Sequence, residues 1–166
     1  MFETIDPKNL KLNVFSAMGD QWMLVTAGTA QHCNTMTASW GGLGVLWNQP
    51  MATVYVRPQR YTRVFLDEQE YFTLSFFPEQ FRKQLALCGS QSGREVNKVE
   101  ACGFTVREGA GGAPYFEQAE LVLVCRKRMV LPMKREAVPA EVDEKYYDND
   151  HHLIYWGEIV EALQKV

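Results

Sequence analysis

A row of hydroxyl-bearing side chains near residue 35 is the first feature of this sequence that could do chemistry. Residues 34–40 alternate as a β-strand does, with successive side chains on opposite faces. One face carries Thr35, Thr37 and Ser39, and the other carries Asn34, Met36, Ala38 and Trp40. Such a row also suits an ordinary threonine-rich strand. The glycine-rich run at 41–44 favours a ligand site, because glycine lets a ligand approach the backbone closely.

Two arginines and two hydroxyl groups follow where the next predicted strand ends. The group consists of Arg57, directly before Pro58, and of Arg60, Tyr61 and Thr62, directly after the turn. A guanidinium can bind two phosphate oxygens at once. Hydroxyls, exposed amides, a flat aromatic ring and paired arginines together suit a phosphorylated, planar heteroaromatic ligand. We therefore interpret residues 34–62 as a binding site for flavin mononucleotide (FMN).

A polar loop farther along the chain is a further candidate. It spans residues 89–98 and places Ser90 and Ser92 between glycines, but it lacks the residue order of a phosphate-binding P-loop. As a ligand loop it would bring a hydroxyl or an amide to the edge of the ring and Lys98 to a charged group. An ordinary surface loop has the same composition, so both interpretations stay open.

Strands are expected to supply most of the framework. Alternating or β-rich runs predict strands at residues 22–27, 34–40, 51–57, 70–77, 104–107, 120–131 and 152–163. Helical spacing predicts helices at 60–67 and 79–88, the second with Gly89 as its C-cap. The polar stretch 132–150 is expected to be a surface excursion with room for a short helix. Residues 1–166 are thus predicted to form a single domain built as a small antiparallel β-barrel.

Composition and charge narrow the class of protein. The 166 residues are 46% hydrophobic and carry a net charge of −3, which favours a globular protein and argues against binding to nucleic acid or an anionic membrane. No apolar run reaches the roughly 18 residues that a membrane-spanning helix needs. Without a CxxC pair or a signal peptide, the four cysteines are expected to be reduced, buried thiols in a cytoplasmic protein. The histidines, which are His32, His151 and His152, form no recognisable metal-ligand set, so no metal site is expected.

Taken in order, these blocks resemble the flavin reductase-like, FMN-binding split-barrel family. The resemblance rests on residues 34–47, 54–62, 72–77, 92–94 with Lys98, and 155–160. It covers the chain from about Trp22 onward, with a departure at Glu95 and Asn97, where aspartates are expected. The resemblance implies a mainly β fold, a split β-barrel with a few short helices, in a homodimer that holds FMN near the subunit interface.

The resemblance also implies roles for individual residues. The segment 34–40 would line the flavin ring and its ribityl chain, Arg57, Arg60, Tyr61 and Thr62 would hold the phosphate, and the loop with Ser90, Ser92 and Lys98 would close over the flavin. The implied activity is reduction of flavin by NAD(P)H, followed by electron transfer to a small-molecule or protein acceptor. The alternative is a non-catalytic FMN-binding or electron-relay protein. An oligonucleotide-binding barrel is disfavoured by the acidic charge.

Overall fold

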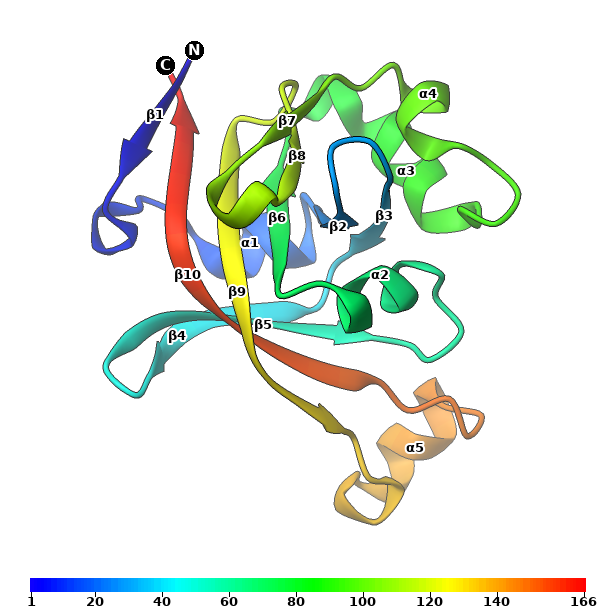
Figure 1. Cartoon of the computed structure of the whole chain (residues 1–166). Coiled ribbons are helices and arrows are strands. Elements are labelled where there is room, and N and C mark those ends of the chain that lie inside the picture. Colours follow the sequence, from blue (N-terminus) through cyan, green and yellow to red (C-terminus); the bar gives the residue numbers. More distant parts are fainter.

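One antiparallel sheet of eight strands forms the body of the molecule in a computed structural model that describes all residues 1–166 (Figure 1). Seven strands lie in the order β3-β2-β6-β9-β10-β5-β4, and β1 pairs with β10. Their bounds are β1 Phe2–Ile5, β2 Met23–Gly28, β3 Cys33–Ala38, β4 Gly41–Leu46, β5 Gln49–Val56, β6 Tyr71–Phe76, β9 Leu121–Pro132 and β10 Leu153–Lys165. The end strands β3 and β4 do not pair with each other, so the barrel stays open. The expected mainly β fold is confirmed.

Short helices and a small second sheet cover this barrel. The helices are α1 Val14–Gly19, α2 Thr62–Glu68, α3 Arg82–Ser90, α4 Lys98–Cys102 and α5 Ala140–Tyr146, and the small sheet pairs β7 Val106–Glu108 with β8 Pro114–Phe116. In Figure 1, α3 and α4 lie together on the side of β3, whereas α5 lies at the end of an arm formed by the outer parts of β9 and β10. None of these helices has the length and apolar character needed to cross a membrane.

The long strand β10 connects the parts of the sheet. Its first half, residues 153–158, pairs with β5, and its last residues, 162–165, pair with β1. Strand β9 follows β10 along nearly its whole length, with register shifts at Trp156/Gly157 and Ile159/Glu161. Such irregularities bend a strand, and Figure 1 shows β10 curving from the barrel into the arm.

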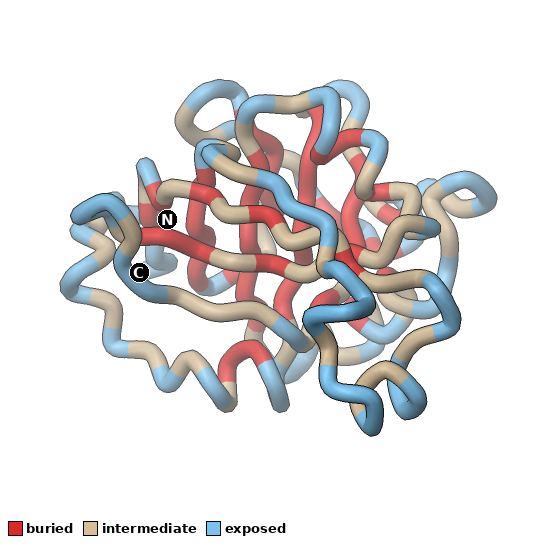
Figure 2. Tube along the Cα trace, turned by 90° about the horizontal axis from the view of Figure 1, so that it is seen from below, coloured by how far each residue is buried: buried red, intermediate tan, exposed pale blue.

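Two apolar clusters lie on opposite faces of the sheet. The alternation predicted for strand 120–131 is confirmed, because Leu123 and Cys125 belong to the cluster inside the barrel and Val122 and Val124 to the cluster beneath α3 and β8. Figure 2 shows the buried residues concentrated along the central strands and the exposed ones at the turns. The cluster inside the barrel fixes one face of β3, since Met36 packs in it.

The structure corrects and extends the predicted elements. The helix at 79–88 does not end with Gly89 as its cap; α3 continues to Ser90 and is capped by Gln91. Gly89 instead serves close packing, because a Cβ there would lie 3.3 Å from the Cβ of Thr37. The glycine run at 41–44 belongs to β4, a strand the sequence did not predict because glycine has a low β propensity. The short helix in the 132–150 excursion is present as α5.

Candidate functional site

Two adjoining cavities lie beside β3. One, of about 190 Å³, is lined by residues 36–40 together with Tyr55, Arg57, Arg60 and His152. The other, of about 130 Å³, is lined by residues 59–62, 90–93 and Lys98. Arg60 lines both cavities, so together they form one groove, which we call the β3 groove. We refer to the first cavity as its ring end and to the second as its cation end.

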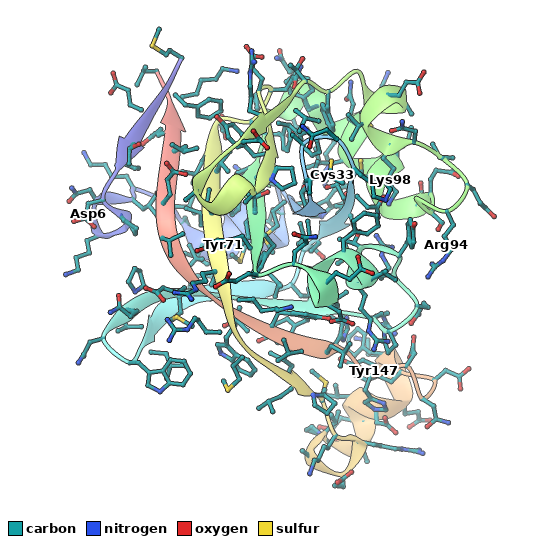
Figure 3. All side chains as sticks on the ribbon, in the orientation of Figure 1. Asp6, Cys33, Tyr71, Arg94, Lys98 and Tyr147 are labelled. Atoms are coloured by element: carbon teal, nitrogen blue, oxygen red, sulfur yellow. The ribbon has the colours of Figure 1, made fainter.

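The cation end contains a buried ammonium group. Lys98 is only 4% exposed, and its Nζ donates to the carbonyl oxygens of Thr35 and Cys88, each at 2.8 Å. Burial, reinforced by the nearby charge of Arg60, lowers the pKa of Lys98 to about 8. Figure 3 shows Lys98 close to Cys33, between the β2–β3 hairpin and the loop that carries Arg94.

A second cation lies beside this lysine. The guanidinium of Arg60 donates to the carbonyl of Gly89 at 2.9 Å and to that of Cys88 at 3.5 Å. Neither Arg60 nor Lys98 forms an ion pair with a carboxylate. Two positive charges thus share one carbonyl acceptor without an anion to neutralise them, an arrangement that favours an anionic ligand.

The loop between α3 and α4 approaches β3 closely. A Cβ at Gly93 would lie 2.0 Å from Oδ1 of Asn34, so only glycine fits there. The hydroxyls of Ser90 and Ser92 have local partners, the carbonyl of Ala86 and the amide of Arg94 respectively. Asn97, which replaces the expected aspartate, caps α4 by accepting from the amide of Glu100 at 3.2 Å. The structure therefore brings Ser92 and Lys98 to the groove through a loop and a capped helix.

Two of the three hydroxyls in the predicted row form hydrogen bonds inside the protein. The Thr35 hydroxyl is fully buried against that of Thr26 at 2.8 Å, and the Thr37 hydroxyl donates to the carbonyl of Leu85. The Asn34 amide donates to the Thr62 hydroxyl at 2.8 Å. On the other face, Met36 and Ala38 pack in the barrel core. Ser39 alone among the three hydroxyls lines the groove without an internal hydrogen bond.

The ring end has aromatic walls and a neutralised arginine. The Trp40 ring, 44% exposed, lies 5.4 Å from the rings of both Tyr146 and His152. Arg57 donates to Asp150 at 2.5 Å and to the Tyr146 carbonyl at 2.8 Å. Hydrogen bonds from the Asp148 amide, from Gln59 and from Arg57 hold the pKa of the Asp150 carboxyl well below its usual range. The structure thus separates the two arginines of the sequence, with Arg57 paired at the ring end and Arg60 unpaired at the cation end.

Two residues that line the ring end are not among the site residues predicted from the sequence. Tyr55 lies two positions before Arg57 on β5, so the alternation of a strand could have placed it on the same face. His152 is 5% exposed, and its Nδ1 lies 2.8 Å from the hydroxyl of Tyr147. Burial, and secondarily the charge of Arg57, lowers the pKa of His152 to about 4, so its ring is neutral near pH 7. No spacing in the sequence distinguishes His152 from His151.

The fold is therefore an open antiparallel β-barrel with a cationic groove beside an edge strand. The chain matches the model of the flavin reductase like domain over residues 15–164, and it therefore belongs to this family. This membership confirms the predicted split-barrel fold and indicates a flavoprotein of the oxidoreductase kind. No curated protein matches the chain.

Several solved structures share the fold. Flavoredoxin from Methanosarcina acetivorans is 25% identical, with 97% of this chain and 76% of that chain covered and a TM-score of 0.70. An FMN-binding protein from Thermus thermophilus with bound p-hydroxybenzaldehyde is 23% identical, with 87% and 71% covered and a TM-score of 0.68. An NADH:FAD oxidoreductase from Streptomyces globisporus is 20% identical, with 98% and 87% covered and a TM-score of 0.65.

The lowered pKa of His152 predicts a pH-dependent loss of stability. Between an unfolded pKa of about 6.5 and the folded value of about 4, the unfolded chain binds a proton that the folded protein does not, so stability falls as pH falls through this window. The contribution is at most about 3 kcal/mol. In urea titrations from pH 7 to pH 4, the variant His152→Asn should lose less stability than the wild type.

The exposed His32 provides the matched control for this comparison. The variant His32→Asn should retain the wild-type dependence on pH. If His152→Asn and the wild type lose the same free energy of unfolding over this range, His152 is not held neutral by its surroundings.

Proposed function

We propose that this chain is an FMN-binding oxidoreductase that takes a hydride from NAD(P)H and passes the electrons to a further acceptor. In this proposal residues 1–166 act as one flavin reductase-like domain. The observation that carries the proposal is the pair of cations, Arg60 and Lys98, that meet at the Cys88 carbonyl without a carboxylate. A phosphate dianion is the ligand group that such a pair suits.

The dimensions and chemistry of the β3 groove fit FMN. Thr35 on β3, whose carbonyl holds Lys98, and Ser39, directly after the end of β3, are four residues apart, a separation of about 13 Å at about 3.3 Å per residue. A planar ring joined to a phosphate through a five-carbon chain can span this length. The phosphate would lie against Arg60 and Lys98, and the ring would lie beside Ser39 and Trp40. In this assignment Arg57 shapes the ring end and does not hold the phosphate.

A neighbouring cavity of about 370 Å³ is larger but suits an anion less well. It shares Tyr61, Gly93 and Lys98 with the cation end. Its lining includes both Arg94 and Glu95, so its charges are mixed. The Arg94 guanidinium lies over the Tyr61 ring, at 4.6 Å from its centroid, and donates to the Gln59 carbonyl at 3.3 Å. These features support placing the phosphate in the β3 groove.

The residues of the ring end would orient the flavin and its donor. FMN, when bound, supplies the two-electron chemistry of hydride transfer. The free Ser39 hydroxyl would hydrogen-bond the polar edge of the ring, and Trp40 would shield one side from water. His152 stays neutral and is held by Tyr147, so it offers a hydrogen-bonding nitrogen to the groove without adding charge. No acid or base on the protein is required for the hydride step.

The proposal also includes a homodimer. The arm exposes a cavity of about 710 Å³ with mostly apolar walls, among them Leu131, Val138 and Ile154. Tyr147 lines this cavity and also contacts His152, so whatever covers the arm adjoins the ring end. Apolar patches of this kind on soluble proteins mark interaction sites, and we assign this one to a second copy of the chain.

Light scattering after size-exclusion chromatography tests the dimer. The wild type should have twice the mass of one chain, and Leu131→Lys should shift it toward the monomer, because Leu131 is 49% exposed in the single chain and would be covered in the dimer. The variant Val166→Lys, at a 71% exposed position away from the arm, should stay dimeric. A wild-type mass of one chain would contradict the assignment.

Flavin-binding measurements test the phosphate clamp. The variants Lys98→Met and Arg60→Ala should each weaken FMN binding by about 10-fold or more, since a hydrogen bond to a charged group contributes about 1.5–3 kcal/mol. Binding of riboflavin, which lacks the phosphate, should change little. Lys83→Met, at an exposed position of α3, and Arg57→Ala should both retain the wild-type ratio of FMN to riboflavin affinity. An equal loss of affinity for the two flavins in the first two variants would contradict the clamp.

Anaerobic bleaching tests the catalytic part of the proposal. Protein loaded with FMN should lose its flavin absorbance when NADH or NADPH is added without oxygen, and faster than free FMN does under the same conditions. Flavin that binds but is not reduced faster than free FMN would favour the alternative, a non-catalytic or electron-relay protein. Retention of the yellow colour after dialysis would separately indicate that FMN is held as a prosthetic group and is not released as a product.

A further inference from the structure

Two thiols with no part in the proposed function lie against each other between α3 and α4. The Sγ atoms of Cys88 and Cys102 are 3.7 Å apart, and all four cysteines are free. Cys88 is fully buried and Cys102 is 8% exposed. The remaining two, Cys33 and Cys125, have no second thiol within hydrogen-bonding distance. Among the cysteines, only this pair is placed to react together.

The two thiols must come closer together before a disulfide can form. A disulfide requires a sulfur–sulfur distance of about 2.05 Å, so the pair must close by less than 2 Å. Cys102 ends the five-residue helix α4 and is followed by Gly103, which terminates the helix with a φ of +65° and would have open space around a Cβ. The Cys102 thiol donates to the Gln84 carbonyl at 3.8 Å, and its side chain packs in the same apolar cluster as Cys88.

We propose that Cys88 and Cys102 are a modification site, at which a peroxide forms a disulfide that loosens the cation end of the β3 groove. The backbone connects the disulfide to the cation end of the groove. The carbonyl of Cys88 accepts from both Lys98 and Arg60, and α4 begins at Lys98 and ends at Cys102. Drawing Cys102 toward Cys88 therefore shifts α4 against the carbonyl that positions both cations. This second half of the proposal rests on the proposed FMN site.

The chemistry balances with hydrogen peroxide as the oxidant. The more exposed thiol, Cys102, attacks one peroxide oxygen, the O–O bond breaks, and a sulfenic acid and one water form. The Cys88 sulfur then attacks the sulfenic sulfur, the S–O bond breaks, and the disulfide and a second water form. The two thiols lose two electrons and two protons, and peroxide is reduced to two waters. Burial raises the pKa of Cys88 to about 12, so the reaction is slow compared with that of an exposed thiolate.

Mass spectrometry of the full chain tests the bond itself. Folded protein exposed to hydrogen peroxide, blocked at its free thiols and digested without reductant should yield a peptide pair joined through Cys88 and Cys102. The variants Cys33→Ser and Cys125→Ser should still give this pair, whereas Cys88→Ser and Cys102→Ser should not. Oxidation that ends at sulfinic or sulfonic acids, or that links other cysteines, would overturn the proposal. This readout does not depend on flavin binding.

Flavin titration then tests the coupling to the groove. Oxidised wild-type protein should bind FMN at least about fivefold more weakly than reduced protein, with recovery on adding dithiothreitol, and peroxide should leave the affinity of Cys102→Ser unchanged. A disulfide that forms without altering FMN affinity would overturn the coupling. If reduced protein binds no FMN at all, the proposed function fails, while the mass-spectrometric result on the disulfide stands by itself.

Discussion

The buried ammonium of Lys98 is the interaction on which the candidate site depends. Removing a charge from water costs several kcal/mol, which must be offset by good partners. The partners here are backbone carbonyls of Thr35 on β3 and of Cys88 on α3, so the lysine joins α4 to both elements. Arg60 adds a second charge at the same carbonyl. Two neighbouring cations without a carboxylate destabilise the folded protein when no ligand is present. A bound anion would offset this cost.

The open barrel makes this arrangement possible because it leaves β3 at an edge. An edge strand has unpaired backbone groups that must be covered or bonded elsewhere. In this chain α3 and α4 cover β3: the Thr37 hydroxyl bonds the backbone of α3, and the Thr35 carbonyl accepts from Lys98. The contact between Gly93 and Asn34 brings the intervening loop down onto the same strand. The groove therefore lies where α3 and α4 leave part of the edge strand β3 uncovered.

Local patterns in the sequence predicted most of the strands and the groove-forming segments, but not β4 and not how the side chains are shared between packing and binding. Alternation grouped Thr35, Thr37 and Ser39 on one face, yet only packing against β2 and α3 decides that the first two hydroxyls are used internally. Arg57 and Arg60 are three residues apart and looked equivalent. They differ because Asp150, 93 positions from Arg57 in the sequence, forms an ion pair with Arg57 and not with Arg60. Interactions over such separations leave no trace in local spacing.

The ion pair between Arg57 and Asp150 also explains the electrostatic asymmetry of the groove. At the ring end the charge of Arg57 is matched by Asp150, and His152 is kept neutral by burial and by the same arginine. At the cation end, by contrast, Arg60 and Lys98 remain unmatched. A ligand with a neutral planar head and an anionic tail consequently gains in one orientation and loses in the reverse one. The unpaired positive charges at one end would thus set the direction in which such a ligand lies along β3. The shape of the groove need not determine this direction.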